Sequence, residues 1–135
     1  MPKISTVNPD GTGDYPDVSF WALLESESDY GAPTELHLDG LFDLSILGLD
    51  LIGTWPNGLK ITCADSSKAF NGIKRSLCGL TSTSEKGTIV NYGHDITLVG
   101  LEVYNTFGHL SYNNLVEGGS FDAINCLFED NLSSY

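Results

Sequence analysis

Acidic side chains are the most abundant residues capable of chemistry in this 135-residue chain, which has 18 Asp and Glu against six Lys and Arg. Glu102 and Glu129 lie 27 residues apart in an internal repeat, and Tyr104 lies close to the first of them. Paired carboxylates held about 5–10 Å apart can hydrolyse a glycosidic bond. The spacing therefore suggests Glu102, Tyr104 and Glu129 as a carbohydrate-binding face, although carboxylates on a strand face are more often simply solvated.

Other catalytic and metal-binding patterns are missing from the sequence. His37, His94 and His109 have no metal-ligand spacing, and no G-x-S-x-G nucleophile elbow accompanies His94 and Asp95. The turn at Gly11-Thr-Gly13 is not followed by the Lys of a phosphate-binding loop. We therefore expect no catalytic residue, no metal and no cofactor, and a protein that is not an enzyme. A polysaccharide lyase or hydrolase is the alternative.

The three cysteines are Cys63, Cys78 and Cys126. They form no C-x-x-C pair, which argues against a zinc site or a redox dithiol. Each lies among apolar residues, so we expect three buried free thiols that act as small hydrophobic side chains. Free thiols in turn suggest folding in a reducing cytoplasm.

Charge is distributed unevenly along the chain, whose formal net charge is −12. Residues 4–59 contain ten acidic residues and no Lys or Arg, whereas five of the six basic residues lie between Lys60 and Lys86. So acidic a chain repels phosphate backbones, which argues against nucleic-acid binding. No apolar run approaches the roughly 20 residues that cross a bilayer, and no signal peptide is recognisable; neither a membrane nor nucleic acid is an expected partner.

The N-terminal third predicts a strand at 4–7, a turn at 8–13 and a short helix from residue 18 to residue 25. Asp17 is a plausible N-cap, and Val18, Trp21 and Ala22 form an apolar stripe at helical spacing. From residue 34 onward, apolar and polar residues alternate as in half-buried strands. We expect one domain over 1–135, with a strand and capping helix at 1–33 and strands over 34–135.

The last third of the sequence repeats. At an offset of 25 residues, apolar positions from 96 to 103 match apolar positions from 121 to 128. The matched pairs are Ile96 and Phe121, Leu98 and Ala123, Val99 and Ile124, Leu101 and Cys126, and Val103 and Phe128. Residues 88–91 also match 114–117 at an offset of 26. Such self-similarity predicts an all-β fold, a right-handed parallel β-helix (β-solenoid) of stacked rungs with a short N-terminal capping helix; a β-sandwich is the alternative.

Two features of this arrangement point to partners. The chain stops directly after the last strand, and an uncapped solenoid end needs cover. We therefore expect the N-terminal part of a longer chain, or a partner such as a second copy in a homo-oligomer. The irregular Ser- and Gly-rich segment at about 64–86, with Lys68, Lys74 and Arg75, is the candidate contact surface.

The opening, residues 7–24 (Val-Asn-Pro-Asp-Gly-Thr-Gly-Asp-Tyr-Pro-Asp-Val-Ser-Phe-Trp-Ala-Leu-Leu), resembles the N-terminal capping segment of pectinesterase-like right-handed β-helix proteins. Together with residues 35–39 and 95–103, it is more similar to parallel β-helix structural proteins of bacteriophages. The chain has no Gln and a single Arg, Arg75, so it lacks the pectinesterase active-site pattern.

The phage resemblance implies a virion structural protein, made in the host cytoplasm and carried on the particle exterior. It would be a capsid decoration or cement protein, or a head-fibre protein, in contact with other virion proteins. The alternative is a tail-spike β-helix that binds or depolymerises host surface polysaccharide.

Overall fold

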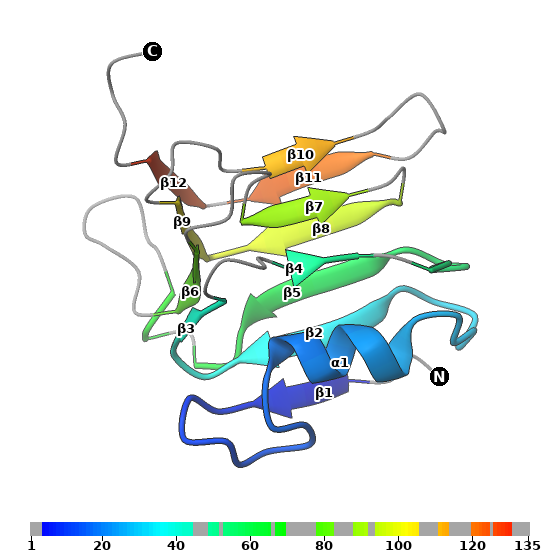
Figure 1. The fold of residues 1–135 in the computed structure, drawn as a ribbon, viewed down its shortest axis with the longest axis horizontal. Helices are drawn as coiled ribbons and strands as arrows, with labels where there is room; N and C mark the ends of the chain where they lie inside the picture. The colour runs from blue at the N-terminus through cyan, green and yellow to red at the C-terminus, as the bar shows by residue number, and fades with distance from the viewer. Residues whose placement is uncertain are drawn as a thin grey trace.

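The computed structural model describes residues 4–44, 49–51, 53–65, 67–69, 78–82, 88–91, 94–105, 111–113, 120–124 and 126–130. Within these ranges, short strands form three sheets and one helix lies near the N-terminus (Figure 1). Every pairing between the named strands is parallel. The chain visits the three sheets in turn, so each sheet gathers strands that are far apart in the sequence.

The largest sheet has five strands in the order β1–β2–β5–β8–β11. They are β1 (Ile4–Val7), β2 (Thr34–Leu38), β5 (Leu59–Cys63), β8 (Ile96–Val99) and β11 (Phe121–Ile124). The second sheet contains β3 (Leu41–Asp43), β6 (Gly79–Ser82), β9 (Glu102–Asn105) and β12 (Leu127–Asp130) in that spatial order. The third contains β4 (Leu49–Asp50), β7 (Ile89–Asn91) and β10 (Ser111–Asn113).

The core is filled by residues at alternate positions of these strands. Leu36, Ile61 and Leu98 pair in register across β2, β5 and β8, and none of them has exposed surface. Burying one such side chain contributes about 1.5–3 kcal/mol. Because side chains alternate between the two faces of a strand, the neighbouring Glu35 and Lys60 lie on the partly exposed outer face.

The predicted 25-residue repeat is confirmed by the register of the last strands. Ile96 pairs with Phe121 and Val99 with Ile124 across β8 and β11, and Val103 pairs with Phe128 across β9 and β12. The second predicted alignment, of 88–91 with 114–117, is wrong because Ile89 pairs with Ser111. Apolar matches alone did not determine the register of that strand, because connections between sheets differ in length.

The helix α1 (Val18–Glu25) begins as the sequence predicts. The Asp17 carboxylate accepts a hydrogen bond of 2.8 Å from the backbone N–H of Phe20, which satisfies a donor of the first turn. Val18, Trp21 and Ala22 are buried, and α1 contacts β4. The Trp21 ring lies 5.2 Å from that of Trp55, centroid to centroid, so the helix is anchored in the core.

Glu25, at the last position of α1, is also buried. The hydroxyl groups of Tyr15 and Tyr30 both donate hydrogen bonds to its carboxylate. Tyr15 precedes the helix and Tyr30 follows it, so one carboxylate ties both flanking segments to α1.

The outer edge of β1 is covered by the turn that follows it. The Thr6 N–H donates to the Asp14 carboxylate at 2.8 Å, and the Asp14 N–H donates to the Thr6 carbonyl at 2.7 Å. Val7 and Gly13 form an antiparallel bridge, for which Gly13 has a positive φ of 103°. The second half of β1 is therefore hydrogen-bonded within the chain at the edge of the five-stranded sheet.

The fold class predicted from the sequence is wrong. The structure is a small α/β-type fold with parallel sheets and one helix, rather than an all-β right-handed β-helix, and no closed solenoid is present within the described ranges. The alternative, a β-sandwich, is also wrong, because sandwich sheets are antiparallel. Alternation and repeats predict strands in parallel register, but they do not determine whether those strands close into a coil.

Candidate functional site: the disulfide-linked corner

The chain passes from the five-stranded sheet to the second sheet at four places. Three of these connections contain only two residues, namely 39–40, 100–101 and 125–126. The fourth, between β5 and β6, contains residues 64–78. This corner therefore carries an insertion, which is shorter than the irregular segment expected over 64–86 because β6 begins at Gly79.

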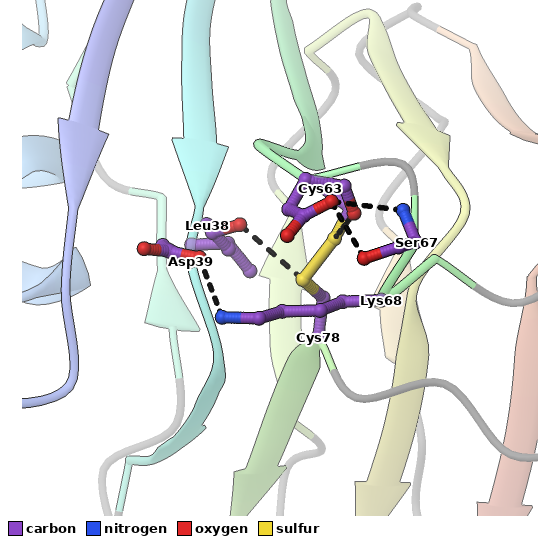
Figure 2. The surroundings of a disulfide bond; sticks show 7 residues. Leu38, Asp39, Cys63, Ser67, Lys68 and Cys78 are labelled. Atoms are coloured by element: carbon purple, nitrogen blue, oxygen red, sulfur yellow. Dashed lines mark hydrogen bonds and ion pairs between the residues drawn. A yellow bond between two sulfur atoms is a disulfide. The ribbon is translucent and has the colours of Figure 1, made fainter.

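A disulfide joins the two ends of the insertion (Figure 2). Cys63 is the last residue of β5 and Cys78 immediately precedes β6, and their Cα atoms lie 5.8 Å apart. The expectation of three free thiols is therefore wrong for Cys63 and Cys78. The inference that the chain folds in a reducing cytoplasm rested on free thiols, so it loses its support. Cys126 is a free thiol, and its partial burial raises its pKa.

The register shows what the disulfide replaces. Thr62 pairs with Val99, and Gly79 pairs with Glu102. Cys63 and Cys78 therefore stand level with residues 100 and 101, which are joined by a peptide bond. The disulfide thus links two positions that the neighbouring repeat joins by a peptide bond. After the insertion, β6 pairs in register with β3 and β9.

The start of the insertion is fixed by a local turn and by an ion pair. The Asp65 carboxylate accepts hydrogen bonds from the Ser67 hydroxyl at 2.7 Å and from the Ser67 N–H at 2.9 Å. These bonds lower the pKa of Asp65. The Lys68 ammonium donates to the Asp39 carboxylate at 2.8 Å (Figure 2), which raises the pKa of Lys68. Lys68 thus ties the insertion to the two-residue connection of the adjacent repeat.

The three basic residues expected to contact a partner have different positions. Lys68 forms the internal ion pair with Asp39, and its side chain is 36% exposed. Lys74 and Arg75 lie outside the described residues. Partner contact by this segment stays a prediction, with Lys68 acting at least in part as an anchor.

The two glutamates of the candidate carbohydrate-binding face lie on neighbouring strands but are not directly paired. Glu102 pairs with Leu127, and Glu129 pairs with Tyr104, so the two glutamates are displaced by two residues along neighbouring strands. Glu102 is only 5% exposed. The side chains of Tyr104 and Glu129 lie outside the described part of the structure. Sugar binding by these residues stays a prediction, and the burial of Glu102 gives it no support.

A second polar group lies on the outer face of the five-stranded sheet. The Glu35 carboxylate lies 3.0 Å from Nε2 of His37 and 3.9 Å from the ammonium of Lys60. In the portion of the chain that the structure describes, no three His, Cys, Asp or Glu side chains are grouped to hold a metal ion. No helix there has the length and apolar character needed to cross a membrane.

Sequence reasoning missed the disulfide, although a signal for it existed. Cys63 and Cys78 flank the stretch that breaks the alternation of strands, and their separation is 15 residues. Two cysteines at the ends of an insertion into a repeat are candidates for a crosslink, because the repeat itself requires those ends to be close.

Comparisons with protein-family models, with curated proteins and with solved structures each gave no match to this chain.

Proposed function

We propose that this chain is a structural protein of a bacteriophage particle, a capsid decoration, cement or head-fibre protein carried on the particle exterior. The observation that carries the proposal is the insertion at residues 64–78, held by a disulfide on a framework of parallel sheets. The resemblance of residues 7–24, 35–39 and 95–103 to phage structural proteins supports the phage setting. Binding to neighbouring virion proteins, rather than catalysis, is the proposed activity.

The geometry of the corner suits a binding role. Connections between strands tolerate additions and frequently carry function, and this one adds residues that the register does not need. Its ends are fixed by the Cys63–Cys78 disulfide and by the Lys68–Asp39 ion pair. Constraining a loop before it binds reduces the entropy lost on association. The polysaccharide alternative has no comparable support, because Glu102 is buried.

The test is incorporation into particles encoded by the same genome. We expect the chain in purified virions, detected by mass spectrometry and by antibody labelling of intact particles. The decisive variant removes residues 64–77 and carries Cys63→Gly and Cys78→Leu, which reproduces the Gly100–Leu101 connection of the next repeat. We expect this variant to fold but to be absent from particles.

A matched control is Asp122→Asn, which changes an exposed residue of β11 and should leave incorporation unchanged. The proposal fails if the wild-type chain is absent from purified particles. It also fails for this surface if the shortened variant is incorporated as well as the wild type.

A further inference from the structure

The outward face of α1 is apolar. Phe20, Leu23 and Leu24 are 46%, 67% and 58% exposed, and their i, i+3 and i+4 spacing places them in one stripe on the helix surface. The opposite face, with Val18 and Trp21, is already buried in the core. A helix at the surface of a soluble domain normally turns polar residues outward, so α1 presents an apolar face that the core does not use.

This face is held rigidly. Asp17 caps the start of α1, the two tyrosine hydroxyls hold Glu25 at its end, and Trp21 packs against Trp55. A fixed helix keeps its three exposed side chains together and prevents them from turning inward. Contiguous exposed apolar surface of this kind marks interaction sites.

Part of the outer edge of β1 is already hydrogen-bonded within the chain. Figure 1 shows α1 at the same end as β1, and the outer edge of β1 is covered by the hydrogen bonds between Thr6 and Asp14. A partner that approaches α1 from this side therefore finds the backbone groups of Thr6 already bonded, and the exposed side chains of α1 are the surface that it contacts.

The charge around the stripe defines the partner. Residues 4–59 contain ten acidic residues and no Lys or Arg. Three of the exposed acidic residues flank α1: Asp17 at its start, Glu27 just beyond its end, and Asp50 on β4, the strand that α1 contacts. A second copy docked through the same face would bring like charges together, which is costly. A surface that offers apolar side chains among Lys and Arg would match both properties.

We propose that the stripe formed by Phe20, Leu23 and Leu24 binds a second protein through an amphipathic segment whose apolar side chains are flanked by Lys and Arg. The apolar contact supplies affinity, and the acidic border selects a basic partner and speeds its approach. The insertion at the disulfide corner is a separate surface, so this proposal does not depend on the phage function.

The test uses a fluorescent amphipathic peptide of Leu and Lys, about four helical turns long, with binding measured by fluorescence anisotropy on the whole chain. The variant Phe20→Ser/Leu23→Ser/Leu24→Ser should bind at least about tenfold more weakly. The control variant Leu41→Ser/Ile124→Ser, which changes exposed apolar residues on β3 and β11, should bind as the wild type does. A peptide with Glu in place of every Lys should not bind.

A second variant, Glu27→Lys/Asp50→Lys, keeps the apolar stripe and reverses part of its acidic border. It should weaken binding of the Leu and Lys peptide, and the difference from the wild type should shrink as salt is raised. Because these side chains are exposed, both variants should retain the circular dichroism spectrum of the wild type.

Three results would overturn the proposal. The first is equal binding of the Leu and Lys peptide by the wild type and the triple Ser variant. The second is equal binding of the Glu and Lys peptides by the wild type. The third is a wild-type dimer in analytical ultracentrifugation that the triple Ser variant abolishes, which would make a second copy the occupant of the face.

Discussion

The same corner of the molecule is built in two ways in adjacent repeats. Between β8 and β9 the chain turns with Gly100 and Leu101 alone, whereas between β5 and β6 it makes an excursion of residues 64–78 closed by a disulfide. The strands on either side keep the same register in both repeats. The parallel sheets therefore require only a short turn at this corner, and the longer connection is an addition whose ends must be brought back together.

The largest effect should come from the residue that restarts the core after the insertion. Leu80 on β6 is fully buried and pairs with Phe42 and Val103. Leu80→Ala should lower the free energy of unfolding by about 2–5 kcal/mol, measured by urea denaturation. Thr81→Ala, next along the strand on the other face, should change it by less than about 0.5 kcal/mol. Similar losses for both would mean that β6 does not contribute to the core as described.

The disulfide should have the next largest effect. Cys63→Ser/Cys78→Ser should destabilise the chain by about 3 kcal/mol, as expected for a closed loop of this length. Urea denaturation with and without a reducing agent measures it: reduction should weaken the wild type and leave the double Ser variant unchanged. If the wild type unfolds at the same urea concentration in both conditions, the crosslink does not set the stability of this corner.

The smallest effect should come from the Asp65 turn, and it should depend on pH. Hydrogen bonds from Ser67 hold the pKa of Asp65 below its ordinary value of 3.8 in the folded chain. A lowered folded pKa gives a contribution that is complete above the unfolded value and lost as the pH falls through the folded value.

Between about pH 5 and about pH 2, the midpoint of thermal unfolding should therefore fall further for the wild type than for Asp65→Asn. Asp122→Asn, at an exposed position of β11, is the matched control and should follow the wild type. Parallel curves for Asp65→Asn and the wild type would show that the ionised carboxylate of Asp65 adds nothing to stability.

What the sequence could predict depended on whether a residue lies within the repeat. The match of Ile96 with Phe121 predicted a pairing that the structure contains, because apolar residues that recur at a fixed offset occupy equivalent positions on paired strands. The N-cap at Asp17 was also predictable, since capping is local. Cys63 and Cys78 were judged by their immediate neighbours, which are apolar, while their proximity depends on the register of β5 and β6.

Glu102 also shows that local sequence pattern did not predict the environment of a side chain. Alternation along β9 and the acidic character of the side chain suggested a solvated face, yet Glu102 is buried. Its environment depends on what packs against β9 from other parts of the chain, which alternation along a single strand does not reveal. The closure of the strands into a coil was likewise inferred from a periodicity that only requires parallel stacking.

The Cys63–Cys78 crosslink also limits how far this chain can be stretched. Cys63 and Cys78 are 15 residues apart in sequence and 5.8 Å apart in space. A fully extended polypeptide spans about 3.4 Å per residue, so the bond withholds about 45 Å of length from any pulling force applied through the termini. That length becomes available only when the bond is reduced. While the bond lasts, a pulled chain would thus keep the end of β5 next to the start of β6.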